Sequence, residues 1–300
     1  MPIGRPMLPD RVVPCGQPIR PVQVAEVAPR RRYGCPVPEE QQRRARRAAT
    51  AVRTAALWGA IRDLVTERAD ALGRPLRVLD LGGGTGELAV PLAELGPDLV
   101  AAVTVVDPSP DALAALARRA AESGVHTRVH GSQGDADTLA DLLPEHAQRA
   151  FDLVCCHGVL EVVDDPAATL AVLADALADD GHLSLLVAGR LAAVWARALA
   201  GEFGQAHTAL TSADGRWGIH DPLPRRFDLA QLRGLVEDAG LQMQHWHGIR
   251  LLADLVPSTA VDTDAERAAL IALEDALAGH AAYPFLGEFG AALHVLARRG

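Results

Sequence analysis

Short apolar runs alternate with amphipathic segments along the central part of the chain. The runs that predict strands are Leu76–Leu81, Ala101–Val106, Thr127–His130, Phe151–Cys156 and His182–Val187. Apolar residues at helical spacing between them predict helices at Gly86–Leu95, Pro110–Ser123, Asp137–Ala147 and Ala167–Ala178. Because parallel strands need crossover connections, this alternation predicts a doubly wound parallel sheet with helices on both of its faces.

The flanks of this region have a different pattern. Nine of the twenty prolines lie within residues 1–38, which predicts an extended, mobile N-terminal extension because proline fixes φ and lacks an N–H donor. The remaining residues, 39–300, form one predicted domain that begins with a helix over 39–72. After the fifth strand we expect an irregular insertion at 188–227, a helix at Asp228–Ala239, a strand from Leu241, a helix at Asp264–Leu277 and a final apolar run, AALHVLARR.

Composition and charge narrow the class of protein. The chain is 49% hydrophobic and 22% charged, which is typical of a soluble globular protein. Residues 1–60 hold 11 Arg against 4 acidic residues, whereas the rest of the chain is strongly acidic. No apolar stretch predicts a signal peptide or a membrane span, and the four cysteines show no zinc-site spacing. We therefore expect a cytoplasmic enzyme without a metal, and leave its oligomeric state open.

Gly82, Gly83, Gly84 and Gly86 lie in the stretch RVLDLGGGTGELA, where the first predicted strand turns into the first predicted helix. In doubly wound sheets this turn borders the ligand-binding crevice, and glycines let a ligand approach the main chain. A dinucleotide and S-adenosylmethionine both fit such a turn. Asp80, directly before the glycines, favours S-adenosylmethionine, because a carboxylate attracts its ammonium group and repels a pyrophosphate.

Three later strands also end in polar residues. Asp107 can accept hydrogen bonds from both hydroxyls of a ribose, or it caps the next helix. Asp135 and Ala136 follow the third strand, where an adenine edge is expected, although Asp135 can equally cap a helix. His157 leaves the fourth strand beside the expected methyl donor, or has a structural role. The order of these residues, each at the end of a strand, resembles the pattern of the class I S-adenosylmethionine-dependent methyltransferases, which have a Rossmann-like fold.

A closer resemblance extends from Arg53 to the C-terminus. The stretches RTAALW, RVLDLGGGTG, CHGVLEVVDDP, HGIRLLADL and LIALEDAL resemble the SmtA-like group, the family of the bacterial tRNA 5-carboxymethoxyuridine methyltransferase. This resemblance implies a mostly parallel seven-stranded sheet and S-adenosylmethionine as the cofactor. It also implies that Arg53 contacts the cofactor's carboxylate, although a solvated helix charge explains this arginine equally well.

The resemblance implies a carboxylate on tRNA as the methyl acceptor. A carboxylate is already ionised at neutral pH, so its methylation needs no general base, and we assign no catalytic residue. The family's lysine-rich run is replaced here by TSADGRWGIHDPLPRR, and Glu288 stands where an arginine is expected. The acceptor is therefore either tRNA or a small molecule, and it can be a carboxylate or another oxygen or nitrogen acceptor.

Five residues are candidates for contact with the acceptor: Trp217, His220, Arg226, Arg250 and Tyr283. Arg250 can present its guanidinium to a carboxylate. Trp217 and Tyr283 are alternatively core aromatics, and His220 a loop residue. Two other readings of the whole chain are a nicotinamide-dependent oxidoreductase, which Asp80 disfavours, and a catalytically inactive protein that still binds S-adenosylmethionine.

Overall fold

The computed structural model describes residues 39–142, 149–257 and 260–300, with side chains from residue 56 onward. The chain divides into two units, Met1–Gln42 and Arg43–Gly300. The predicted N-terminal extension, including Cys15 and Cys35, lies outside the described residues. Everything below concerns the second unit, apart from the backbone of the first helix, which begins in the first unit.

Seven strands and nine α-helices occupy the described residues. The strands are β1 (Leu76–Leu81), β2 (Val100–Asp107), β3 (Val129–Gln133), β4 (Phe151–His157), β5 (Leu177–Ala188), β6 (Leu241–Ile249) and β7 (Ala292–Arg299). The helices are α1 (Glu39–Leu72), α2 (Ala89–Glu94), α3 (Pro110–Glu122), α4 (Leu139–Leu142), α5 (Pro166–Ala176), α6 (Arg190–Leu199), α7 (Phe203–Thr211), α8 (Leu229–Asp238) and α9 (Asp264–Ala278), with a 3-10 helix, η3 (Pro284–Phe289), before the last strand.

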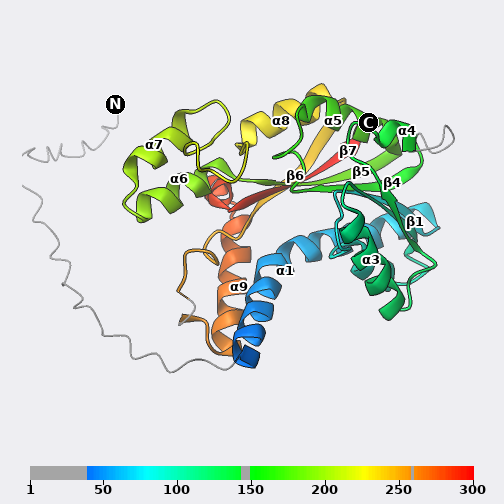
Figure 1. Ribbon diagram of the computed structural model, residues 1–300, viewed down its shortest axis with the longest axis horizontal. Helices are drawn as coiled ribbons and strands as arrows, with labels where there is room; N and C mark the ends of the chain where they lie inside the picture. Colours follow the sequence, from blue (N-terminus) through cyan, green and yellow to red (C-terminus); the bar gives the residue numbers. More distant parts are fainter. Residues whose placement is uncertain (1–38, 143–148, 258–259) are drawn as a thin grey trace, which may run out of the picture. The chain divides into compact units, whose positions relative to one another are not determined.

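The strands form one sheet in the order β3-β2-β1-β4-β5-β7-β6. All neighbours are parallel except β7, which is antiparallel to both β5 and β6. The strand order reverses between β1 and β4, so the carboxyl ends of these two strands flank the switch point where ligands bind in such sheets. This strand order confirms the predicted fold class, and Figure 1 shows the strands together with the helices around them.

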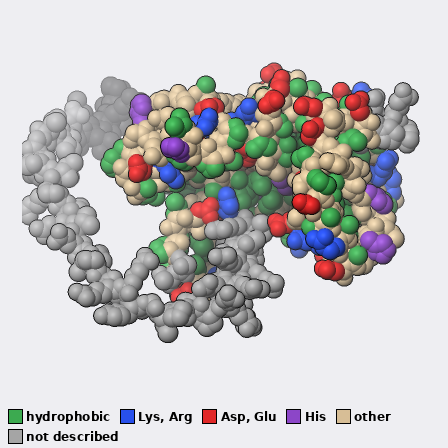
Figure 2. All heavy atoms as spheres, viewed as in Figure 1, with side chains coloured by type: hydrophobic (Ala, Val, Ile, Leu, Met, Phe, Trp, Pro, Cys, Tyr) green, Lys and Arg blue, Asp and Glu red, His purple; other side chains and the backbone are tan. Residues whose placement is uncertain are grey.

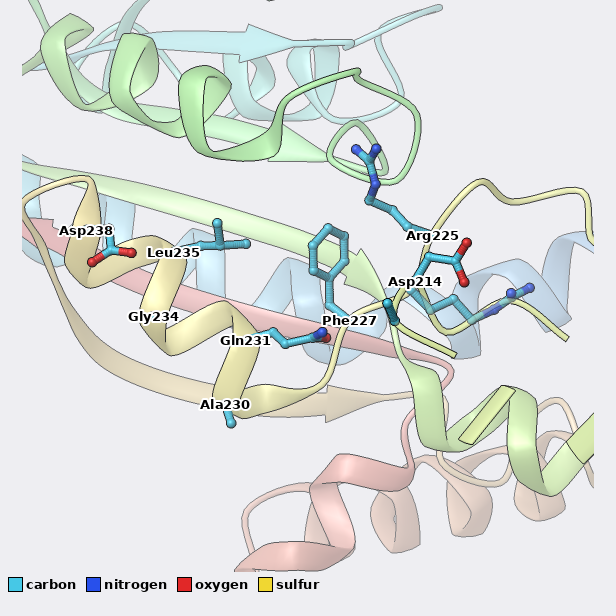
Figure 3. A pocket seen from close by; sticks show the side chains of 10 residues that line it. Asp214, Arg225, Phe227, Ala230, Gln231, Gly234, Leu235 and Asp238 are labelled. Carbon is cyan, nitrogen blue, oxygen red and sulfur yellow. The ribbon is translucent and has the colours of Figure 1, made fainter. Parts of the chain in front are cut away.

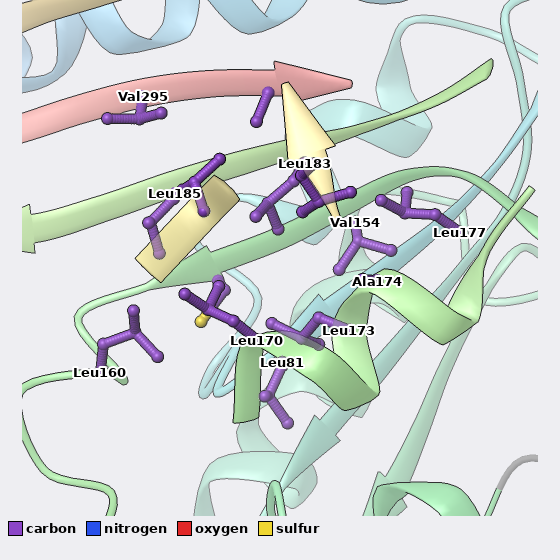
Figure 4. Close-up of a cluster of buried hydrophobic side chains, with 14 of the residues drawn as sticks. Leu81, Val154, Leu160, Leu170, Leu173, Ala174, Leu177, Leu183, Leu185 and Val295 are labelled. Carbon is purple, nitrogen blue, oxygen red and sulfur yellow. The ribbon is translucent and has the colours of Figure 1, made fainter. Parts of the chain in front are cut away.

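Helices cover both faces of the sheet. Ile61 and Val65 of α1 are fully buried against one face, together with residues of α2 and α3. Leu170 and Leu173 of α5 are fully buried in the cluster that covers the other face (Figure 4). Cys155 and Cys156 are buried on the fourth strand, as expected for small core residues. Burial on both faces explains why the strands read as continuous apolar runs.

Most predicted helix starts are set by side-chain caps. The Ser109 hydroxyl accepts the N–H of Ala112 at the start of α3, and Asp165 accepts two N–H groups at the start of α5. The capping box of Asp228 and Gln231 begins α8. These caps set where α3 and α5 begin after β2 and β4, and where α8 begins before β6.

The prediction of an irregular insertion at 188–227 was wrong in its first half, since α6 and α7 occupy residues 190–199 and 203–211. The irregular structure was predicted because the strand–helix alternation stops here. The segment RLAAVWARAL nevertheless consists almost wholly of good helix formers, and it forms α6. The third strand begins later than predicted. Within the predicted helix at 137–147 the structure describes α4, which begins at Leu139, and residues 143–148 lie outside the described residues. No helix in the described part of the chain is long and apolar enough to cross a membrane.

Candidate active site

The turn after β1 has a backbone that only glycine adopts readily. Gly82, Gly84 and Gly86 have φ values of 70°, 53° and 77°, in the left-handed region. Gly83 is required for another reason, because a Cβ there would lie 2.4 Å from Oδ2 of Asp80. The four predicted glycines therefore form one tight turn around the Asp80 carboxylate.

Asp80 is a buried acidic side chain with one unpartnered oxygen. Its side chain is 2% exposed, and its Oδ2 atom is buried without a hydrogen-bond partner. Burial, followed by repulsion from Asp107, raises the pKa of Asp80 to about 7. An unsatisfied buried carboxylate oxygen is costly, and an ammonium group would satisfy it. The turn therefore fits the amino-acid end of S-adenosylmethionine.

Asp107 ends β2 and supports the same turn from the neighbouring strand. Its Oδ2 accepts the N–H of Gly84 and its Oδ1 the N–H of Ser109, each at 2.9 Å. A carboxylate accepts about four hydrogen bonds, so each oxygen retains capacity for a further donor. The same side chain thus orders the glycine turn and helix start, and can also receive two ribose hydroxyls.

Asp135 and Ala136 follow β3, as predicted. Oδ1 of Asp135 accepts the backbone N–H of Thr138 at 3.0 Å and its hydroxyl at 2.8 Å. These two bonds lower the pKa of Asp135 and make it a local cap, which is the alternative that its sequence position allows. Ala136 is 6% exposed and packs into the core. Their contact with an adenine stays a prediction.

His157 ends β4, and its Nε2 lies 2.9 Å from the Ser184 hydroxyl of β5. Asp80 pairs with Cys155, two residues before His157, so the Asp80 and His157 side chains lie on the same face of the sheet. Burial lowers the pKa of His157 to about 4. The ring is therefore a neutral wall beside the glycine turn. The Arg53 side chain lies outside the described residues.

A cavity of about 550 Å³ opens beyond the carboxyl end of β5; we call it the α6–α9 pocket. Its walls are mostly apolar and come from α6, the 217–226 loop, residues 250–255, α9 and η3. Trp217, Arg226 and Arg250 line it, so the structure brings together three of the five acceptor candidates. His220 is exposed outside it, and Tyr283 is 53% exposed and stacks on His280 instead.

The guanidinium groups in the α6–α9 pocket have partners within the chain. Arg226 forms a bidentate pair with Asp221, with Nη2 to Oδ1 at 2.8 Å, and the carboxylate side chain is fully buried. Nε of Arg250 lies 3.4 Å from Oδ2 of Asp254. The Arg197 guanidinium lies 4.7 Å from the Trp217 ring centre. The pocket is therefore mostly apolar, and carboxylates of the same chain pair with two of its three arginines, Arg226 and Arg250.

Two buried glutamates hold the backbone around the α6–α9 pocket. Oε1 of Glu161 accepts the N–H of Ala188 at 2.6 Å, while its Oε2 is buried without a partner. The Glu274 carboxylate accepts the N–H groups of residues 251, 252 and 253. Neither glutamate was among the predicted site residues. The sequence signal that could have identified them is an acidic residue within an apolar stretch, VLEVV for Glu161 and IALED for Glu274.

A second hollow, of about 520 Å³, lies beside α8 with Phe227 and Leu235 in its wall (Figure 3). Arg225 lines it, but its guanidinium reaches the loop after β4 and donates to the carbonyl of Leu160 at 3.2 Å. This arginine serves the fold. In the described part of the chain, no cluster of three or more His, Cys, Asp or Glu side chains is placed to hold a metal ion.

Comparison with known proteins agrees with this geometry. A family model described as a methyltransferase domain matches residues 52–245, almost two thirds of the chain. The chain belongs to this family. It is an S-adenosylmethionine-dependent methyltransferase, so the predicted enzyme class and cofactor are confirmed, and the nicotinamide reading is excluded.

Three relatives illustrate the range of the family. The chain is 29% identical to the tRNA 5-carboxymethoxyuridine methyltransferase of Escherichia coli over 83% of this chain and 88% of the relative. It is 31% identical to the ubiquinone biosynthesis O-methyltransferase of Sodalis glossinidius, over 62% and 68%. The S-adenosylmethionine-dependent methyltransferase structure from Mesorhizobium loti is 21% identical, with a TM-score of 0.51 over 75% of this chain and 92% of that one, and supports the fold.

Proposed function

We propose that the protein methylates an oxygen or nitrogen atom of a small molecule bound in the α6–α9 pocket. One observation carries the proposal: Ala188, which lines that pocket, ends β5 two residues after Leu186, the register partner of His157. The strand of His157, β4, also pairs with β1, which leads into the Asp80 turn. A molecule in the pocket would therefore lie next to a cofactor at the glycine turn.

The residues around the turn match the parts of the cofactor. S-adenosylmethionine supplies a methyl group on a positively charged sulfur, which a lone pair of the acceptor attacks. Asp80 would hold the ammonium group and Asp107 the ribose hydroxyls, with Gly84 and Gly86 giving access to the backbone. The family resemblance implies that the adenine would contact Asp135 and Ala136. It also implies that the cofactor's carboxylate would contact Arg53.

The lining of the α6–α9 pocket favours a small molecule over tRNA. Its walls are apolar, and Arg226 and Arg250 already face carboxylates of the same chain. RNA binding depends on cations that neutralise phosphates, whereas residues after 60 carry an excess of acidic side chains. A pocket of about 550 Å³ is within the usual range for small-molecule ligands.

tRNA is the second candidate acceptor. The similarity to the Escherichia coli tRNA 5-carboxymethoxyuridine methyltransferase covers most of both chains and favours it. Arg250 could then grip a carboxylate on a nucleotide whose base enters the α6–α9 pocket.

Tritiated S-adenosylmethionine separates these acceptors. The full chain is incubated with bulk tRNA or with a small-molecule extract, and the label is counted in each fraction. We expect label in the small-molecule fraction, and less of it with Ala193→Leu, which fills the α6–α9 pocket; Ala200→Leu, at the exposed end of the same helix, is the control. Label in tRNA alone would overturn the small-molecule acceptor, and label in neither would overturn the proposal.

A further inference from the structure

Four side chains from four neighbouring strands form a continuous hydrogen-bonded chain inside the sheet. Nε2 of His157 on β4 lies 2.9 Å from Oγ of Ser184 on β5, which lies 2.9 Å from Nε2 of His294 on β7. Nδ1 of His294 lies 3.3 Å from Nε2 of His247 on β6. We call this set the imidazole chain.

Strand register explains why these side chains meet. His157 pairs with Leu186, Leu186 with His294, and His294 with His247, so the three rings lie in one row across the sheet. Ser184 is two residues before Leu186 and therefore lies on the same face. The rings pack edge to face, at 88° between His157 and His294 and 80° between His247 and His294.

The two middle members are sealed from water and the two ends are not. Ser184 and His294 are 0% exposed, whereas His157 and His247 are partly exposed. His157 ends β4, which pairs with β1 ahead of the glycine turn, and its register partner Leu186 lies two residues before Ala188 in the wall of the α6–α9 pocket. His247 faces Asp275, an exposed residue of α9, and His245 of its own strand. The imidazole chain therefore runs from His157, at the carboxyl end of β4, to His247 on β6, the strand at one edge of the sheet.

Burial keeps the three rings neutral. It lowers the pKa of His157 to about 4, that of His294 well below its usual range, and that of His247 despite the opposing charge of Asp275. A neutral imidazole has one N–H and one acceptor nitrogen, and a hydroxyl has one hydrogen. Each middle member can therefore donate to one neighbour and accept from the other. All the hydrogen bonds of the chain can thus point from His157 toward His247, or all of them the opposite way.

We propose that the imidazole chain takes the proton from a hydroxyl or amine acceptor during methyl transfer. This inference rests on the proposed function and specifies the acceptor: it carries an O–H or N–H rather than a carboxylate. The acceptor atom forms its bond to the methyl carbon as the bond from carbon to sulfur breaks. Its proton passes to Nδ1 of His157.

The remaining protons move in the same direction, so that no ring gains a charge. The hydrogen on Nε2 of His157 passes to Ser184, the Ser184 hydrogen to Nε2 of His294, and the hydrogen on Nδ1 of His294 to Nε2 of His247. The hydrogen on Nδ1 of His247 leaves to water beside Asp275. After product release, Nδ1 of His157 loses its proton to water in the open crevice, His247 regains one from solvent, and the starting direction returns.

Imidazole tautomers test the chain without any acceptor. Two-bond proton–nitrogen correlations on full-length, ¹⁵N-histidine-labelled protein report which nitrogen of each ring carries hydrogen. We expect the Nε2 atoms of His157 and His294 to carry one proton between them, because the Ser184 hydroxyl accepts from one and donates to the other. Protons on both atoms, or on neither, would overturn the relay while leaving the methyltransferase assignment intact. Exposed His245 is the internal control.

Two readouts on the reaction complete the test. The tritiated product should keep its label in mild alkali, which cleaves methyl esters but not ethers or methylamines; release of the label would overturn the acceptor class. Ser184→Ala should lower kcat on the labelled acceptor at least about tenfold with an unchanged KM for S-adenosylmethionine, and Ser184→Thr should restore it. An unchanged kcat in Ser184→Ala would overturn the relay.

Discussion

Glu274 on α9 accepts the backbone N–H of Leu251 at 2.7 Å, directly after Arg250. The same carboxylate accepts the next two N–H groups, at 2.8 and 2.6 Å. Arg250 has a φ of 60°, which is unfavourable for a residue with a side chain and persists only where neighbouring contacts enforce it. Glu274 thus holds the conformation that turns the Arg250 guanidinium into the α6–α9 pocket.

Replacing Glu274 tests this relationship. Glu274→Gln keeps the shape but places an NH₂ group against backbone donors, so we expect a loss of about 2 kcal/mol in the free energy of unfolding, measured in urea. The KM for the acceptor should rise several-fold while the affinity for S-adenosylhomocysteine stays constant. Leu273→Ala, an exposed change on the same helix, is the control. An unchanged acceptor KM would show that Arg250 does not depend on this contact.

The buried Asp80 carboxylate predicts a pH dependence of cofactor binding. Its pKa is raised to about 7, so most molecules of the free protein hold a neutral Asp80 at pH 6, and half hold an ionised one at pH 7. An ammonium ligand requires the ionised form, so the affinity for S-adenosylhomocysteine should rise about fivefold from pH 6 to pH 7. Calorimetry at both pH values measures it. Asp80→Asn should bind more weakly and lose the pH dependence; if it keeps that dependence, another group is responsible.

The same raised pKa has an opposite effect on stability without ligand. Because the folded state retains the Asp80 proton to higher pH than the unfolded chain, this group reduces the free energy of unfolding as pH rises from about 4 to 7. At pH 8, ligand-free Asp80→Asn should therefore melt at a higher temperature than the wild type. A lower melting temperature would mean that the ionised carboxylate has a partner inside the fold.

Gly83 and Gly59 form a matched pair of glycine substitutions. A Cβ at Gly83 would lie 2.4 Å from Oδ2 of Asp80 and 2.9 Å from Val105, so Gly83→Ala should cost about 1–3 kcal/mol of stability and weaken S-adenosylhomocysteine binding. A Cβ at Gly59, within α1, meets nothing within 4 Å. Gly59→Ala should stabilise the protein by up to about 1 kcal/mol without changing affinity. Equal effects of both changes on binding would contradict the close packing of the turn.

Replacing Arg226 tests whether this arginine has a structural role, through its pair with Asp221, or contacts the acceptor. Arg226→Met leaves the fully buried Asp221 carboxylate without its partner, so unfolding should become easier by about 3–5 kcal/mol. Adding Asp221→Asn should recover part of this loss, measured by urea denaturation. Full stability of the single variant would indicate that Arg226 is available to an anionic acceptor instead.

The fold class and the glycine turn could be predicted from sequence because both leave local signals. Apolar runs, caps and the glycines after Asp80 each leave a pattern within a few residues, and the confirmed fold depends on them. The helices α6 and α7 were not predicted because they follow one another without a strand between them, so the strand–helix alternation stops there. Their residues nevertheless favour helix.

The acceptor side depends on contacts that no local pattern encodes. His220 and Tyr283 were plausible by residue type, but His220 is exposed in the 217–226 loop and Tyr283 is exposed just before η3, and neither lines the α6–α9 pocket. Glu274 meets residues 251–253 only through tertiary packing. The imidazole chain depends on the register of β5, β6 and β7, and the two antiparallel pairings bring together histidines that are 47 residues or more apart in sequence.

The central claim is that S-adenosylmethionine binds at the turn between Asp80 and Asp107. Calorimetric titration of the wild type and Asp107→Ala with S-adenosylhomocysteine tests it most directly, because this change removes the acceptors of the Gly84 and Ser109 N–H groups along with any ribose contact. The account predicts one binding event in the wild type and at least about tenfold weaker binding in the variant. Equal affinities in the two proteins, or an absence of binding to the wild type, would contradict it.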